Sequence, residues 1–166
     1  STMAQYRLSI EGMQAAGIHG MARIGADFWP AIKDPGGRTR SFLGIYPESG
    51  WAQLNLSNSF AYILAPGKDG AEATVRFEML REGVEDEHVR IFIEKALLDP
   101  ATRARLGDDL AVRAQQVLDD RTADILRARG GSAIRWQWYA AGTPDRTAAL
   151  YAIADEVTAA LGDNRP

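Results

Sequence analysis

Between Phe60 and Leu98 a short apolar segment passes through a turn into a long charged segment, and this order limits the folds available to the chain. Pro66-Gly67-Lys68-Asp69-Gly70 combines proline with two glycines, which predicts a tight turn. From about Ala71 to Leu98 apolar residues recur at helical spacing, which predicts one long helix. A buried strand that leads straight into a helix is typical of α/β proteins, so the predicted fold class is α/β.

The segments before this run predict a helix, a second strand and a long loop. Met3 to Ala16 has helical spacing, and His19 to Ile24 has the character of a short buried strand. Pro30 to Ser49 is rich in proline, glycine and charged residues, which predicts a loop. Two buried strands joined by a long connection suit a parallel sheet, but they cannot cover their own edges. We therefore expect further strands to come from elsewhere.

The last third of the chain predicts two more helices. Asp99-Pro100 has the form of a cap followed by a first-turn proline, which predicts a helix running towards Arg129. Thr143-Pro144 predicts the start of the last helix. The residues of that helix expected to face the core are Leu150, Ile153, Val157 and Leu161.

The long helix expected over 71–98 has two distinct faces. At 100° per residue one face is apolar and is predicted to lie in the core; its members are Phe77, Leu80, Val84, His88, Ile91, Phe92 and Leu98. Beside it Glu78, Arg81 and Glu85 have the spacing of helical ion pairs, and we expect them to form a structural network. Glu85-Asp86-Glu87-His88 is no metal motif, because consecutive helical residues point about 100° apart.

Composition narrows the function classes. The formal net charge is −3 and basic residues alternate with acidic ones, so we expect no nucleic-acid partner. There is no cysteine, which rules out disulfides and thiolate metal sites. No apolar run approaches the length of a membrane span, so no membrane partner is expected. Neither a metal nor a cofactor is predicted, and the compartment stays open.

One motif resembles a known enzyme family. Pro66-Gly67-Lys68-Asp69-Gly70 followed by Arg76-Phe77-Glu78-Met79-Leu80-Arg81-Glu82-Gly83-Val84-Glu85-Asp86-Glu87 is similar to the Y-P-G-x-D-G and R-x-E-x-L-R-x-G-x-E-D-x-E segments of glycoside hydrolase family 123 and its relatives. The segment Gly20 to Trp29, with Asp34-Pro35, follows an earlier family segment more loosely. The resemblance covers about Gly12 to Leu98.

The resemblance implies a fold and an activity. The fold is the C-terminal portion of a (β/α)8 TIM barrel, with residues 1–98 as its last strands and helices and residues 99–166 as a helical extension packed on it. The family cleaves N-acetylgalactosaminide linkages with an Asp-Glu pair that would lie upstream of Ser1. The implied partners are a carbohydrate ligand and the upstream part of the same barrel. The chain alone is expected to hold no catalytic residue and to be inactive.

Four residues are the predicted substrate contacts. Ligand contacts in such barrels come from the C-terminal ends of the strands, which singles out Asp27 and Trp29. Tyr46 and Trp51, in and after the long loop, are further candidates, because an aromatic face can stack on a sugar ring. The chain departs from the family where Ile24 and Ala26 replace aromatic residues. Two alternatives stay open: a non-catalytic carbohydrate-binding or helical protein-interaction module, and a domain that self-associates to cover its strand edges.

Overall fold

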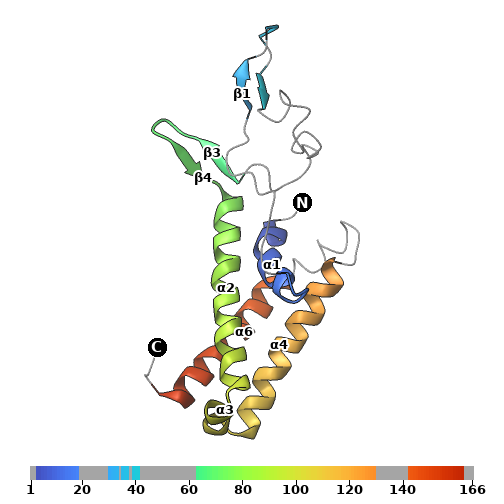
Figure 1. The fold of residues 1–166 in the computed structure, drawn as a ribbon, viewed down its shortest axis with the longest axis vertical. Helices are drawn as coiled ribbons and strands as arrows, with labels where there is room; N and C mark the ends of the chain where they lie inside the picture. The colour runs from blue at the N-terminus through green and yellow to red at the C-terminus, as the bar shows by residue number, and fades with distance from the viewer. Residues whose placement is uncertain are drawn as a thin grey trace.

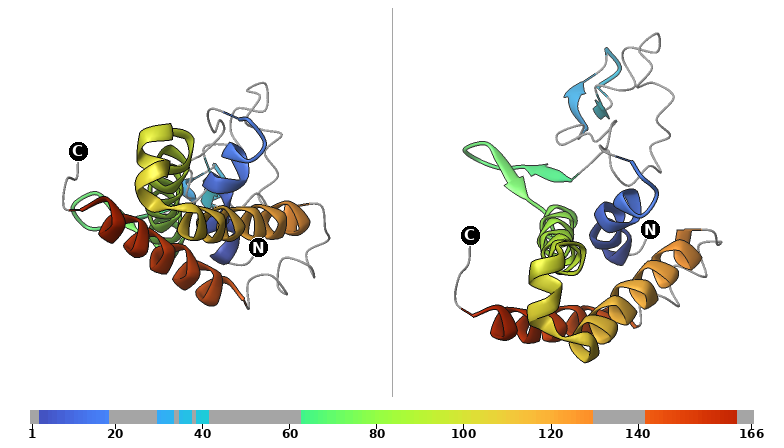
Figure 2. Two further views of the ribbon diagram at one scale, coloured as in Figure 1. Left: turned by 90° about the horizontal axis from the view of Figure 1, so that it is seen from below. Right: turned by 60° about the horizontal axis from the view of Figure 1, so that its bottom comes forward.

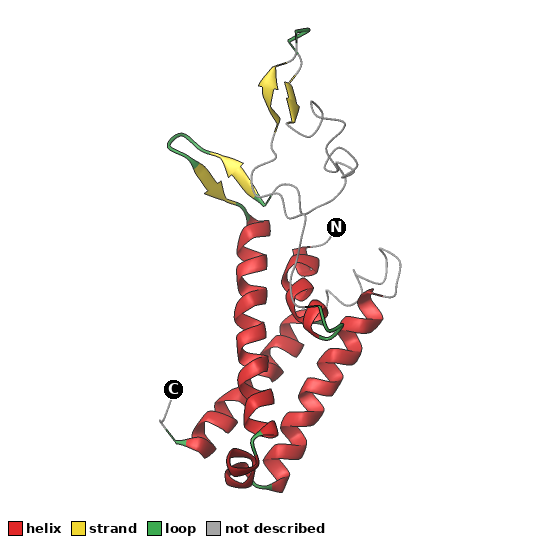
Figure 3. Ribbon diagram, in the orientation of Figure 1, coloured by secondary structure: helices red, strands yellow, loops and turns green. Residues whose placement is uncertain are grey.

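The computed structural model describes residues 3–18, 30–33, 35–37, 39–41, 63–129 and 142–162, and within these it is mainly helical (Figures 1 and 3). The elements, in chain order, are α1 (Met3–Gln14), β1 (Pro30–Lys33), β2 (Thr39–Ser41), β3 (Leu64–Pro66), β4 (Ala71–Ala73), α2 (Val75–Leu98), α3 (Pro100–Leu106), α4 (Asp108–Arg129) and α6 (Thr143–Leu161). Helices α1, α2, α4 and α6 form the body, and the two strand pairs lie at one end of it (Figure 1).

The predicted barrel fold is wrong. The described strands form two separate two-stranded sheets, β1 with β2 and β3 with β4, and both pairs are antiparallel. The turn after Pro66 explains the second pair: Gly67 donates to the carbonyl of Gly70 at 2.7 Å, and a turn this short can only return the chain antiparallel. Of the short apolar segment expected to be a buried strand, Leu64–Pro66 forms the hairpin strand β3, and helix α2 starts at Val75 rather than near Ala71.

Local capping sets the bounds of the helices around Asp99. Thr74 caps α2 by accepting from the backbone N–H of Phe77. The predicted Asp99-Pro100 start is confirmed, because Asp99 Oδ2 accepts from the backbone N–H of Thr102 at 2.8 Å. The helix does not continue to Arg129, however. Gly107 has φ +77°, a left-handed conformation that breaks the segment into α3 and α4.

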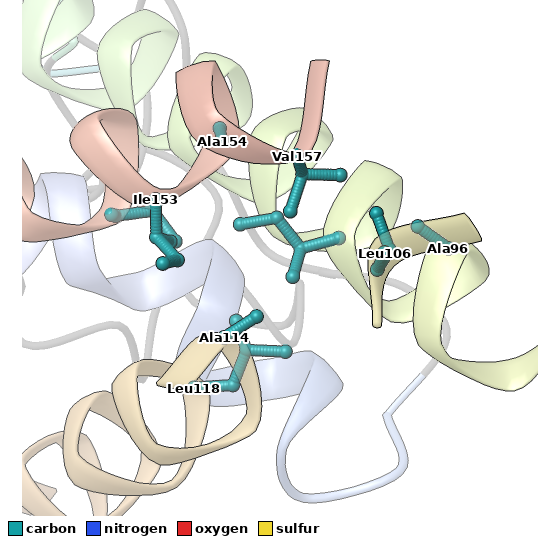
Figure 4. Close-up of a cluster of buried hydrophobic side chains, with 9 residues drawn as sticks. Ala96, Leu106, Ala114, Leu118, Ile153, Ala154 and Val157 are labelled. Atoms are coloured by element: carbon teal, nitrogen blue, oxygen red, sulfur yellow. The ribbon is translucent and has the colours of Figure 1, made fainter. Parts of the chain in front are cut away.

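The apolar core lies where α2, α3, α4 and α6 meet (Figure 4). Leu150, Ile153 and Val157 of α6 are buried as predicted, and Leu161 packs against them at the edge. Their neighbours in the cluster are Ile93, Ala96, Leu106, Ala114, Leu118 and Ala154. The core therefore joins residues on both sides of the boundary expected at residue 98.

Helix α2 buries only part of the face that its apolar spacing predicts: Phe92 packs against the core, and Phe77, Leu80 and Ile91 are half-buried. Its buried residues are Gly83, Asp86, Glu87, Arg90, Ile93 and Ala96. Val84 and His88, both expected in the core, are exposed, and Leu98 is 81% exposed. The physical reason is the partner: the first half of α2 packs on α1, whose Arg7 pairs with Asp86 and Glu82.

No helix in the described part of the chain combines the length and the apolar character needed to cross a lipid bilayer.

Candidate functional site

The predicted substrate contacts Asp27, Trp29, Tyr46 and Trp51 lie outside the described residues. The predicted ion pairs are present on α2: Arg81 contacts Glu78 at 2.9 Å and Glu85 at 2.6 Å. All three side chains are about half exposed and belong to one helix, so solvent screens them and they add little to stability.

A larger charge cluster lies in the interior, between α1, α2 and α4. We call it the buried network and define it by Arg7, Glu11, Asp86, Arg90 and Arg121. At its centre Arg121 donates to both carboxylate oxygens of Glu11, at 2.5–2.8 Å, and to Asp86 at 3.1 Å. The side chains of Glu11 and Asp86 are fully buried, and that of Arg121 is 3% exposed. Buried carboxylates are tolerated only when they are paired in this way.

Arg7 connects α1 to α2 at the upper end of the network. Its Nε and Nη2 donate to the two oxygens of Asp86, at 2.7 and 3.0 Å, and its Nη1 donates to Glu82. The two parallel bonds to Asp86 form the bidentate geometry that arginine favours with carboxylates. Asp86 thus accepts from two arginines that come from different helices.

Arg90 forms the lower end. Its Nε donates to Glu94 at 2.8 Å and its Nη2 to the hydroxyl of Thr122 at 2.7 Å, so it joins α2 to α4. The amide of Gln14, the last residue of α1, donates to the other oxygen of Glu94 at 3.1 Å. The Nη1 of Arg90 lies 3.7 Å from Glu11 and has no hydrogen-bond partner in the structure.

Glu87 lies beside the network, and its charge is poorly compensated. It is 7% exposed, and its Oε2 has no hydrogen-bond partner in the structure. Burial, reinforced by the nearby Glu11 carboxylate, raises the pKa of Glu87 from 4.5 to about 7, against the opposing effects of Arg90 and Arg121. On α6, burial and the Asp86 carboxylate raise the pKa of Tyr151.

The raised pKa of Glu87 predicts that the fold loses stability as the pH rises. The native state holds this proton more tightly than the unfolded chain, so the contribution is complete below about pH 4.5 and is lost as the pH passes about 7. Glu87→Gln should therefore melt a few degrees above the wild type at pH 8.5, and the difference should vanish near pH 5. Thermal unfolding at both pH values tests this, with Glu85→Gln at an exposed neighbouring position as control. Parallel pH profiles for wild type and Glu87→Gln would contradict it.

Gly83 allows α1 to approach α2 closely enough for the network to form. A Cβ atom at this position would lie 2.2 Å from the backbone carbonyl oxygen of Arg7. No real Cβ contact is this short, so only glycine lets the two backbones meet here. The Glu82-Gly83 pair of the motif thus supports the contact with Arg7 from both sides: Gly83 admits its backbone and Glu82 accepts from its guanidinium.

An open groove of about 490 Å³ runs along α2, α3 and α4 below the network. Its lining is balanced in charge, with two arginines and two carboxylates, and two glutamines and several apolar side chains form the rest. The lining residues used below are Arg90, Glu94, Arg103, Gln115, Gln116 and Asp119. Such a surface offers hydrogen-bond donors and acceptors to a neutral polar molecule and no strong field for an ion.

Within the described ranges, no three histidine or acidic side chains lie close enough to share a metal ion. The buried network can instead position helices, and Glu87 beside it can hold a proton. Sequence reasoning missed it because Arg7 and Glu11, four residues apart on α1, have the spacing of a solvated helix face. Glu82, Asp86 and Arg90 on α2 have the same spacing. These charged residues of α1 and α2 pair in the interior because Arg121 of α4 lies between them, and Arg121 is more than a hundred residues from Glu11 in the sequence.

Comparisons with known proteins give no relative: no family model, no curated protein and no solved structure matches the chain.

Proposed function

We propose that this chain is a non-catalytic helical protein-interaction module, and that its docking face is an apolar strip on α2. The strip consists of Phe77, Leu80, Val84, His88 and Ile91. Val84 is 38% exposed, His88 is exposed, and the other three are partly exposed. One observation carries the proposal: α2 turns its charged side inward and leaves the strip in contact with solvent, most of all at Val84 and His88.

The strip and the buried side of α2 point in nearly opposite directions. At 100° per residue the strip is centred roughly 135° around the helix from the residues that meet α1, α4 and α6. Figure 2 (right) looks almost along α2, and those three helices lie to one side of it or below it. A row of apolar side chains turned away from the body of a protein is typical of an interaction surface.

Replacing Val84 with lysine tests whether the strip is a docking face or a part of the fold. We expect Val84→Lys to leave the melting temperature nearly unchanged, since the side chain already reaches solvent, and to shorten retention on a hydrophobic matrix. Val112→Lys, at a position on α4 that is 63% exposed and far from the strip in sequence, is the matched control for added charge. A fall in melting temperature typical of a core substitution would show that Val84 belongs to the fold, and the proposal would fail.

For the wider role we propose that the chain belongs to a glycan-binding or glycan-cleaving protein. The similarity of residues 66–87 to glycoside hydrolase family 123 supports this, as does the charge-balanced groove, whose Gln115, Gln116 and Asp119 could hydrogen-bond sugar hydroxyls. No nucleic-acid partner is proposed, in line with the net charge of −3.

Calorimetric titration with N-acetylgalactosamine tests this wider role. We expect weak binding by the isolated chain and no cleavage of a nitrophenyl N-acetylgalactosaminide. Gln115→Ala should weaken the binding if the groove holds the sugar, while Gln5→Ala, on α1 and not among the groove-lining residues, serves as comparison. Turnover by the isolated chain would contradict a non-catalytic role. If no binding is seen at millimolar sugar, the groove no longer supports the glycan-binding proposal.

A further inference from the structure

We propose that the partner which covers the strip is a second copy of this chain, bound through an antiparallel contact between two α2 helices. The inference rests on the proposed function, because it names the occupant of the docking face. Its first support is the spacing of the strip. Phe77 and Leu80 lie seven and four residues before Val84, and His88 and Ile91 lie four and seven residues after it, so the pattern reads the same in both directions.

That symmetry suits a two-fold contact. In a two-fold dimer the same surface is used by both copies, so it must be complementary to itself. With Val84 on the axis and the helices antiparallel, Val84 meets Val84, Phe77 meets Ile91 and Leu80 meets His88. Four of the five strip residues are apolar, and the imidazole of His88 lies against an aliphatic side chain. The strip therefore matches its own reversed copy along its whole length.

The charges beside the strip also match. An antiparallel pair brings the same flank of the two helices together, and on this flank lie Glu78, Arg81 and Glu85. Their order places Arg81 of each copy next to Glu85 of the other, so each Arg81 can bridge the two Glu85 carboxylates that approach each other across the axis. Because these pairs are exposed, they add little to the affinity of the dimer. They favour the antiparallel orientation and the register of the two α2 helices.

The size of the contact sets the expected affinity. One helix face per copy buries less surface than stable complexes do, which is typical of weak and transient association. We expect a dissociation constant on the order of 10–100 µM. The dimer should thus appear only at high protein concentration, and a single charge on the axis should weaken it at least tenfold.

The absence of cysteine from the chain allows a clean cross-linking test. Helix axes 8–10 Å apart, with Cα atoms about 2.3 Å from each axis, leave about 3.4–5.4 Å between facing Cα atoms, and the upper part of this range suits a disulfide. We expect Val84→Cys to form a covalent dimer under mild oxidation, and Val112→Cys on α4 to form far less. A mixture of Phe77→Cys and Ile91→Cys should cross-link more readily than either variant alone, which distinguishes antiparallel from parallel pairing.

Sedimentation velocity on the unmodified chain completes the test. We expect dimer at about 100 µM for the wild type, and monomer for Val84→Lys. A wild type that stays monomeric up to about 1 mM, with Val84→Cys oxidising no faster than Val112→Cys, would overturn the second-copy proposal. The docking face would survive that result if Val84→Lys still keeps its melting temperature and loses retention on the hydrophobic matrix. A dimer unaffected by Val84→Lys would place the contact elsewhere and would also overturn it.

Discussion

Replacing Arg121 with methionine is expected to destabilise the protein by about 3–5 kcal/mol, the cost of removing one partner from a buried ion pair. Glu11 and Asp86, both with fully buried side chains, would lose the guanidinium that lies between them. Glu11 would lose three hydrogen bonds, and the nearest remaining cation, Arg90 Nη1, is 3.7 Å away. Equilibrium unfolding in urea measures this loss, which should also lower the melting temperature by on the order of 10 °C.

Two further variants separate the charge effect from simple loss of packing. Arg113→Met removes a surface arginine that pairs with Glu156 and Asp109, and it should leave the stability nearly unchanged because solvent screens those pairs. The double variant Glu11→Met with Arg121→Met should recover part of the loss, since it leaves fewer buried charges unpaired. If Arg121→Met and Arg113→Met were equally mild, the network would not contribute to the fold as we describe.

The network also supplies ion pairs that fix how α1 packs on α2. Tyr6 and Leu8 bury apolar surface on α1, but its contacts with α2 that are described above run through Arg7 and Gln14. Ion pairs of fixed geometry determine position more sharply than apolar contacts, because a shift of one residue would leave Asp86 and Glu11 unpaired. We infer that the network determines the register between α1, α2 and α4.

Local signals in the sequence predicted much of the helical framework. Asp99-Pro100 marks a helix start because the carboxylate can cap and proline needs no N–H donor, and neither effect depends on distant residues. The inward row of α6 could be predicted because its neighbours are apolar, so periodicity and burial agree. The break at Gly107 was not predicted, since glycine within a helical pattern is often tolerated.

The inverted face of α2 could not be read from its own residues. Periodicity assigns the apolar row Phe77, Leu80 and Val84 to the core, which holds only when the partner surface is apolar as well. Here the partner is α1, and its Arg7 selects Glu82 and Asp86 instead. The parallel barrel failed for a related reason: the Gly67–Gly70 turn closes a local hairpin, whereas the motif resemblance was used to predict a long-range sheet. The predicted sugar contacts Asp27 and Trp29 stay predictions.

Gly83→Ala should destabilise the protein although alanine is the better helix former. Inside a helix, alanine is favoured over glycine by about 1 kcal/mol, so an uncrowded site would gain stability. At Gly83 the new methyl group would meet the backbone oxygen of Arg7 at 2.2 Å, and a backbone atom cannot rotate away as a side chain can. Helix α1 must therefore move off α2, which lengthens the bonds from Arg7 to Asp86 and Glu82. Overpacking alone costs about 1–3 kcal/mol, and the strained ion pairs add to it, so the clash outweighs the propensity.

Urea unfolding of Gly83→Ala and of Ala152→Gly compares the cost of the steric clash at residue 83 with the difference in helix propensity between alanine and glycine. Ala152 lies at an exposed position of α6, so its replacement reports the propensity difference without a packing change, and a loss of about 1 kcal/mol is expected. Amide hydrogen exchange adds a local readout: in Gly83→Ala the amides of α1 should exchange faster, while those of α6, which packs in the apolar core, keep their protection. A more stable Gly83→Ala variant would show that α1 does not approach α2 this closely. The contacts of Arg7 with Asp86 and of Glu11 with Arg121 would then have to differ from those described. Both contacts require α1 to lie close against Gly83.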